Sequence, residues 1–201
     1  MSAPPAEPGP IDIHGTAEPS AWIRRFAHLV RAHGNVLDLA CGGGRHARLF
    51  HERGHPVTAV DRDLSRLGSL RELPGIEAIA ADLEHAPWPF AGRRFAGIVV
   101  VNYLWRPLFP HLLDALEPGG ALLYETFARG NERYGKPSNP DFLLAPGELL
   151  ELARDRLEIV AYEHGTVFEP RPARVQRLAA LKLPADRNEA TLAPSADTKR
   201  G

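Results

Sequence analysis

The sequence predicts an α/β fold: a doubly wound sheet of seven strands, mostly parallel, with an antiparallel C-terminal hairpin. Two observations predict it. Short apolar runs alternate with segments of helical periodicity, which is the pattern of parallel βαβ units covered by helices on both faces. Near the C-terminus two β-rich runs follow one another without a helix between them, which is typical of a hairpin.

The strand candidates are short, apolar and rich in β-branched residues, as in strands buried on both faces of a sheet. We expect the parallel strands at residues 36–39, 57–60, 76–81, 95–101 and 121–127. The hairpin is expected at residues 157–163 and 175–183. Several runs end at a polar residue, so the sheet edge at their carboxyl ends is predicted to be polar.

The segments outside the strands show helical spacing of apolar residues and recognisable helix ends. Gly34 and Gly54 follow the first two helices, Asp63 can cap the third, and Pro74 with Gly75 ends it. The expected helices cover residues 21–33, 45–53, 64–73, 108–116 and 147–155.

The length of 201 residues suits one domain, which we place at residues 19–183. Residues 1–18 are rich in Pro, Ala and Gly without periodicity, so they are expected to form a flexible tail or lid. Residues 184–201 have the same character and are expected to be a disordered tail.

The composition limits the classes of partner that we expect the protein to bind. With 24 basic and 25 acidic side chains, the net charge of −1 gives no general attraction to nucleic acid or to a membrane, so a small-molecule substrate is expected. Cys41 is the only cysteine, which excludes an internal disulfide and indicates a reducing compartment. No signal peptide or long apolar run is present, so we expect a cytoplasmic protein, either a monomer or a homodimer.

A glycine-rich loop follows the first predicted strand, where α/β sheets bind cofactors. Residues 42–47 fit the dinucleotide pattern G-x-G-x-x-G/A, so the glycines alone admit NAD as well as S-adenosylmethionine (SAM). Asp38 separates the two cofactors, because a carboxylate repels a pyrophosphate but stabilises the sulfonium and ammonium groups of SAM. The alternative is that Asp38 only accepts hydrogen bonds from the loop backbone.

Further acids end the second and third predicted strands. Asp61 lies about 20 residues beyond the glycines, where a carboxylate accepts the hydroxyls of a ribose. Asp82 can accept from an adenine amino group while Leu83 packs on the ring. Each acid alone has another reading, as a helix cap or a solvated strand end. The expected cofactor-binding residues are Asp38, Ala40, Cys41, Gly42, Gly44, Asp61, Arg62, Ala81, Asp82, Leu83 and Asn102.

These motifs resemble those of the class I SAM-dependent methyltransferases, whose first motif is D/E-x-G-x-G-x-G. Residues 38–44 match it, with Ala40 in place of the first glycine, a tolerable change if Ala40 keeps a negative φ. The turn at residues 117–120 also matches. The late helix and terminal strands are similar to those of small tellurite-resistance-type methyltransferases. The resemblance implies a Rossmann-like methyltransferase sheet, SAM as cofactor, and an acceptor pocket built by the N-terminal segment and the loops after strands four and five.

Candidate catalytic residues follow strands four and five: Tyr103 to orient the nucleophile, Arg106 to pair with an anionic acceptor, and Glu125 as a base. Trp105 can stack on the acceptor or the sulfonium, and His46 is a further candidate base. Core packing or surface coverage is an equally good reading for most of them. The basic loop at residues 128–140 is either a lid or a solvated loop, and the histidine spacing predicts no zinc site.

The leading hypothesis is therefore an enzyme that transfers the methyl group of SAM to a small-molecule acceptor. A SAM-binding module without catalysis, such as an inactive partner subunit, is the first alternative. An NAD-dependent oxidoreductase is the second, motivated by the glycine pattern and Asp61 and opposed by Asp38.

Overall fold

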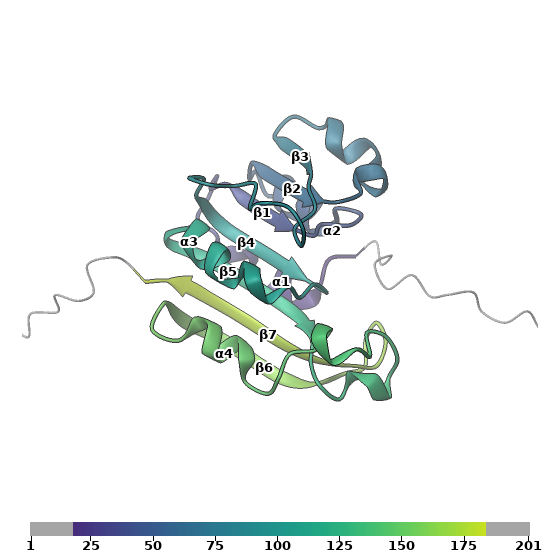
Figure 1. Cartoon of the computed structure of the whole chain (residues 1–201). Helices are drawn as coiled ribbons and strands as arrows, with labels where there is room; N and C mark the ends of the chain where they lie inside the picture. The colour runs from purple at the N-terminus through teal and green to yellow at the C-terminus, as the bar shows by residue number, and fades with distance from the viewer. Residues whose placement is uncertain (1–17, 184–201) are drawn as a thin grey trace, which may run out of the picture.

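A seven-stranded sheet runs through the described part of the chain, residues 18–183 of the computed structural model (Figure 1). The strand order is β3-β2-β1-β4-β5-β7-β6. The strands are β1 Val36–Leu39, β2 Val57–Asp61, β3 Ile76–Ala80, β4 Phe95–Val101, β5 Leu116–Phe127, β6 Leu157–Val167 and β7 Ala173–Lys182. The predicted fold class is confirmed. The predicted tails, residues 1–18 and 184–201, lie outside the described residues apart from Glu18.

The central strands explain the strand order. β1 pairs in parallel with β2 on one side and with β4 on the other. The chain therefore adds β2 and β3 on one side of β1 and then crosses to the other side to add β4 and β5. Every residue of β1 and β4 is buried, which accounts for their apolar sequences. β7 pairs antiparallel with both β5 and β6, as expected for the C-terminal hairpin.

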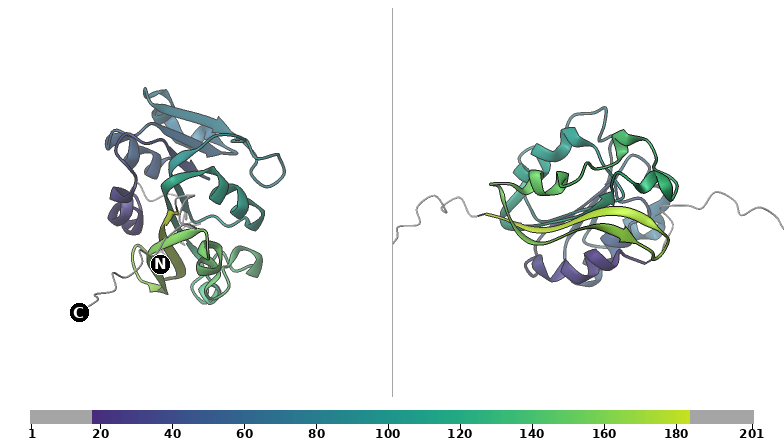
Figure 2. Two further views of the ribbon diagram at one scale, coloured as in Figure 1. Left: turned by 90° about the vertical axis from the view of Figure 1, so that its left-hand side faces the viewer. Right: turned by 90° about the horizontal axis from the view of Figure 1, so that it is seen from below.

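Helices cover both faces of the sheet (Figure 2). On one face lie α1 Ala21–Phe26, α2 Arg45–Glu52 and the 3₁₀ segment η2 Leu64–Glu72, which share an apolar core with the sheet. On the other face lie α3 Phe109–Ala115 and α4 Glu148–Ala153, over the larger core. Four short 3₁₀ turns complete the elements: η1 Ala27–Leu29, η3 Arg106–Leu108, η4 Asn131–Arg133 and η5 Pro140–Phe142. Within residues 18–183, no helix has the length and apolarity needed to cross a membrane.

The structure differs from the sequence expectation mainly at element ends. The first helix stops at Phe26 and continues only as η1, because Val30 must lie extended against Gly97 of β4. The third helix is a 3₁₀ segment interrupted at Gly68, whose φ of 54° and ψ of −134° are not helical. β6 extends to Val167 because its register with β7 continues to that residue.

Gly44 fixes how the glycine loop packs on η2. It precedes α2 with φ of 72°, and a Cβ there would overlap the side chain of Leu70 and lie 2.6 Å from Cδ2 of Leu67. The neighbouring Gly43 is exposed, and the nearest atom to its Cβ position is 3.8 Å away.

We therefore predict that Gly44→Ala lowers the free energy of unfolding by about 2–4 kcal/mol, from left-handed strain and overpacking together. Gly43→Ala is the matched control and should change stability by less than about 1 kcal/mol. Urea denaturation measures both, and equal stability of the two variants would contradict this account.

Candidate active site

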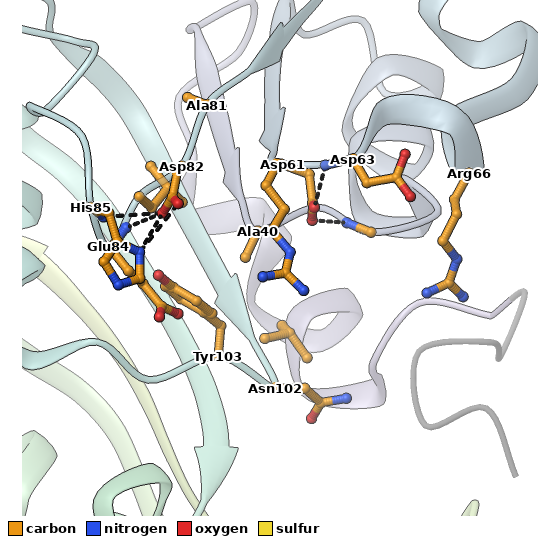
Figure 3. A pocket seen from close by; sticks show the side chains of 14 residues that line it. Ala40, Asp61, Asp63, Arg66, Ala81, Asp82, Glu84, His85, Asn102 and Tyr103 are labelled. Carbon is orange, nitrogen blue, oxygen red and sulfur yellow. Dashed lines mark hydrogen bonds and ion pairs between the residues drawn. The ribbon is translucent and has the colours of Figure 1, made fainter. Parts of the chain in front are cut away.

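A cleft of about 430 Å³, the first cleft, opens at the carboxyl ends of β1 to β4, where the strand order reverses (Figure 3). Open α/β sheets bind ligands at this edge. The predicted residues that line it are Ala40, Gly42, Asp61, Arg62, Ala81, Asp82, Leu83 and Asn102. The lining residues that were not predicted to bind a cofactor are Asp63, Arg66, Glu84, His85, Val101 and Tyr103. Glu84 and His85 directly follow the predicted Asp82 and Leu83, which is the signal that could have found them.

Asp61 joins the loops that follow β1 and β2. Its Oδ2 accepts from the Gly42 amide at 2.9 Å, and its Oδ1 accepts from the Asp63 amide at 3.1 Å (Figure 3). An ionised carboxylate has about four acceptor positions, so each oxygen retains one for a ligand. Asp61 is half-buried and lines the first cleft, which leaves those positions accessible.

Asp82 is held at the end of β3 by its own loop. Its Oδ1 accepts from the amides of Glu84 at 2.9 Å and His85 at 3.0 Å, and Oδ2 lies 3.2 Å from Nδ1 of His85 (Figure 3). The Glu84 and His85 amide hydrogen bonds hold the pKa of Asp82 below its usual range, so the carboxylate stays ionised.

Every second residue of the glycine loop has a left-handed backbone conformation: Ala40 (φ 53°), Gly42 (φ 54°) and Gly44 (φ 72°). The condition under which Ala40 would replace the glycine without strain, a negative φ, is therefore not met. The loop turns there so that the Cys41 amide can donate to the Val60 carbonyl at 3.0 Å. For a residue with a Cβ, this conformation costs roughly 1–2 kcal/mol, which the glycine of the family motif would avoid.

Asp38 lies behind the loop and not in the first cleft. It is 1% exposed, and its Oδ2 accepts from the Ala47 amide in the first turn of α2 at 2.8 Å. In the structure Asp38 is thus a partner of the backbone at the start of α2, and its expected contact with the cofactor stays a prediction. Burial raises its pKa to about 7. Cys41 and Gly44 also lie outside the cleft lining, and burial raises the pKa of the Cys41 thiol.

Tyr103 lines the first cleft, on the side of Asp82 and Glu84 (Figure 3). Its hydroxyl is buried and has no hydrogen-bond partner among residues 18–183. Burial, followed by the negative charges of Glu84 and Asp82, raises its pKa, so the hydroxyl stays protonated and is available as a donor. A protonated phenol on this side of the cleft is poorly suited to act as a base.

Arg106 lines neither this cleft nor the second one described below. Its guanidinium contacts Glu148 at 2.6 Å and 3.0 Å and donates to the carbonyls of Asp141 at 2.7 Å and Leu143 at 3.0 Å. These contacts join η3 to α4 and the preceding loop, so the donors that were expected to meet an acceptor are occupied. Trp105 packs against the larger core.

A second cleft of about 720 Å³ lies beside the first. Its walls come from the segment before α1, the end of β5 and the β6–β7 hairpin, which are far apart in the sequence. Asn102, at the end of β4 with φ of 57°, lines both clefts. Strain of this kind concentrates at functional sites.

Glu125, the candidate base, lines the second cleft. Its Oε2 accepts from Nε of Arg177 at 2.6 Å, and the Glu125 and Arg177 side chains are 12% and 17% exposed. Arg177 also donates to Glu163 at 3.1 Å and lies 5.8 Å from the centre of the Trp22 ring. The Glu125–Arg177 ion pair therefore forms the polar floor of the second cleft.

His46 is not available as a base. It is 3% exposed, and its Nε2 accepts from the Ser20 amide at 3.2 Å. Burial lowers the pKa of His46 to about 3, so the ring is neutral and holds the segment before α1 against α2. Within the described chain, no group of three or more His, Cys, Asp or Glu side chains is arranged to hold a metal ion.

The basic loop after β5 contains η4 and is anchored by Asn131, which is buried. The Asn131 side chain donates to the Pro137 carbonyl at 2.9 Å and accepts from the Arg174 amide of β7 at 3.1 Å. The role of the loop at residues 128–140 as a lid stays a prediction.

Comparison with known proteins agrees with this geometry. The methyltransferase domain family matches residues 36–120. Malonyl-[acyl-carrier protein] O-methyltransferase from Serratia marcescens is 31% identical over 145 residues, covering 68% of this chain and 56% of that protein. Ribosomal RNA small subunit methyltransferase H from Gemmatimonas aurantiaca is 30% identical over 186 residues, covering 86% of this chain and 54% of that protein. The chain thus spans about half the length of the curated relatives it matches.

Among solved structures, TehB from Haemophilus influenzae superposes with a TM-score of 0.64 at 22% identity, over 78% of this chain and 60% of TehB. At this identity the likeness concerns the fold alone. Residues 36–120 of the chain are similar to the methyltransferase domain family, and the fold is shared with solved methyltransferase structures. The NAD-dependent oxidoreductase alternative is therefore set aside.

The buried carboxyl of Asp38 gives a prediction for pH. Its pKa is about 7 in the folded protein against 3.8 ordinarily, so the unfolded chain loses this proton first as the pH rises. Ionisation of Asp38 therefore costs folding stability progressively between about pH 4 and pH 7.

Asn cannot ionise and retains an oxygen that accepts from the Ala47 amide. We expect the stability of Asp38→Asn relative to wild type to rise by about 2–3 kcal/mol between pH 5 and pH 8. Urea denaturation at both pH values measures this change, and a flat or falling difference would contradict it.

Proposed function

We propose that the protein is an enzyme that transfers the methyl group of SAM to a small-molecule acceptor. In this proposal SAM occupies the first cleft and the acceptor occupies the second. The observation that carries the proposal is that Asn102 lines both clefts. Two ligands bound in these clefts would meet at the carboxyl end of β4, as direct group transfer requires.

The residues of the first cleft suit SAM. Asp61 offers a free position on each carboxylate oxygen for the two ribose hydroxyls. Asp82 is ionised and can accept from the adenine amino group, beside the aliphatic side chain of Leu83. The buried hydroxyl of Tyr103 lies near the Glu84 carboxylate without a well-formed hydrogen bond to it, which supports a ligand with an acceptor atom at the same place.

Bound SAM supplies an activated methyl group, whose transfer breaks the carbon–sulfur bond and leaves the electron pair on sulfur. The chain then has to align the acceptor and exclude water. The Asn102 amide is placed to orient the acceptor from the boundary of the clefts. If the acceptor nucleophile carries a proton, the Glu125 carboxylate is the group at the cleft base that can take it, while Arg177 fixes its position.

The alternative of a SAM-binding module without catalysis also draws on one observation. Glu125, the candidate base in the second cleft, is already paired with Arg177. The other candidate base, His46, accepts a hydrogen bond from the Ser20 amide. Transfer to an already anionic nucleophile needs no base, so this pairing is compatible with catalysis. With a single buried cysteine, we place the protein in the reducing cytoplasm.

For the cofactor site, we predict that Asp61→Asn weakens SAM binding at least tenfold, because one charged acceptor of the ribose hydroxyls is lost. Calorimetric titration measures the affinity. The matched control is Asp114→Asn, an exposed carboxylate paired with Arg156 far from the cleft, which should bind SAM like wild type. Unchanged affinity in Asp61→Asn, with its fold intact by circular dichroism, would refute the ribose assignment.

For the activity, incubation with isotopically labelled SAM and a metabolite extract should transfer label to a low-molecular-weight compound, detected by mass spectrometry. Parallel reactions with protein and RNA fractions address the macromolecular acceptors that the names of the curated relatives mention. Label confined to RNA or protein would overturn the small-molecule acceptor. SAM binding without transfer to any fraction would favour the non-catalytic module.

A further inference from the structure

We propose that the acceptor carries a carboxylate at the end remote from the transferred methyl group, and that Arg171 in the β6–β7 turn binds this carboxylate. The proposal rests on the proposed function, in which the second cleft holds the acceptor. It adds the chemical class of that acceptor, an amphipathic monocarboxylate, and a residue that selects it.

The charges that line the second cleft favour an anion. The side chains are four arginines against three glutamates, which leaves one positive charge in excess: Arg24, Arg45, Arg171 and Arg177 against Glu18, Glu125 and Glu169. Glu163 lies outside the lining but contacts Arg177 at 3.1 Å and offsets that excess, so the charge that remains for a ligand is the local one at Arg171. One carboxylate would neutralise Arg171, whereas a phosphate dianion would overcompensate its charge and an ammonium would be repelled by it, so a monocarboxylate fits best.

Among these arginines, Arg171 is the one best placed to accept a new partner. Arg177 is paired with Glu125 and Glu163, and Arg24 is paired with Glu18 at 3.2 Å. For Arg171, within residues 18–183, the structure gives no carboxylate at ion-pair distance. The hydrogen bond that Arg171 forms within this part of the chain is a long contact of 3.5 Å to the Lys136 carbonyl.

The Phe127 ring gives the Arg171 guanidinium a defined position. The guanidinium carbon lies 6.0 Å from the ring centre, within the range of a cation–π contact. A stacked guanidinium keeps its edge N–H groups free, and these donate to both oxygens of a carboxylate in a fork that Lys cannot reproduce.

The strand register places this group away from the reaction end. Glu125 pairs with Arg177, and two residues further Phe127 pairs with Val175, so both pairs face the same side of the sheet. The step from Glu125 to Phe127 is roughly 6–7 Å along β5, toward the β6–β7 turn that carries Arg171. Val175, Ala173 and Val167 pack with Phe127 in one apolar cluster. The cleft therefore offers a polar inner end, an apolar middle and a cationic outer end.

The test uses the full chain saturated with S-adenosylhomocysteine and three ligands that differ only in the head group: 3-phenylpropionate, 3-phenylpropionamide and 3-phenylpropylamine. At about 0.15 M salt, where charges are screened beyond about 8 Å, we expect calorimetry to show the carboxylate binding at least tenfold tighter than the amide. The amine should bind most weakly.

In Arg171→Gln this preference should fall to less than threefold, and Arg171→Lys should retain part of it. Arg133→Gln is the matched control, because it removes the same charge from the neighbouring η4, outside the cleft, and should retain the full preference. Unfolding curves identify any variant that fails to fold, and Arg171→Lys then carries the comparison.

Equal affinity for the carboxylate and the amide, an unchanged preference in Arg171→Gln, or no binding of any of the three ligands would overturn the inference. Binding of S-adenosylhomocysteine is measured first in the same experiment, and its failure would remove the proposed function itself. A labelled methylated product without a carboxylate would overturn this inference and leave the proposed function standing.

Discussion

The hydrogen bond between the Gly42 amide and the Asp61 carboxylate is the interaction on which the rest of the candidate site depends. It ties the loop after β1 to the end of β2 and orients the oxygens of Asp61 toward the first cleft. Behind the loop, Asp38 holds the first turn of α2 through Ala47. The strain at Ala40 is thus fixed from two sides, by one carboxylate in the cleft and one in the core.

The strands and the first cleft were largely predictable from the sequence. β4 was expected at residues 95–101 and is found at Phe95–Val101, because a strand buried on both faces is predominantly apolar and this run is long enough to define its ends. Asp61 and Asp82 could be placed together since the carboxyl ends of parallel strands meet at one edge of the sheet. Helix ends were predicted less well, since tertiary contacts such as Val30 against Gly97 decide them.

Side-chain direction and long-range partners could not be predicted. Asp38 satisfies the family motif equally well whether it faces a ligand or the backbone, so the sequence could not predict its burial or its hydrogen bond to the Ala47 amide. The partner of Arg106, Glu148, lies 42 residues further along the chain. No local sequence pattern therefore shows that the Arg106 donors are occupied. The second cleft combines residues before α1 with a hairpin near the other end of the described chain, a proximity that only the antiparallel docking of β7 creates.

Among residues 18–183, Asn102 is the only residue that lines both clefts, so the two linings are otherwise separate sets of residues. The first cleft draws its residues from positions 40–103, whereas the hairpin contributes positions 167–177 to the second. Substitutions in the hairpin can therefore alter the lining of the second cleft without changing that of the first. After duplication of such a gene, one copy could change its substrate range through substitutions at positions 167–177, while the residues that line the first cleft stay unchanged.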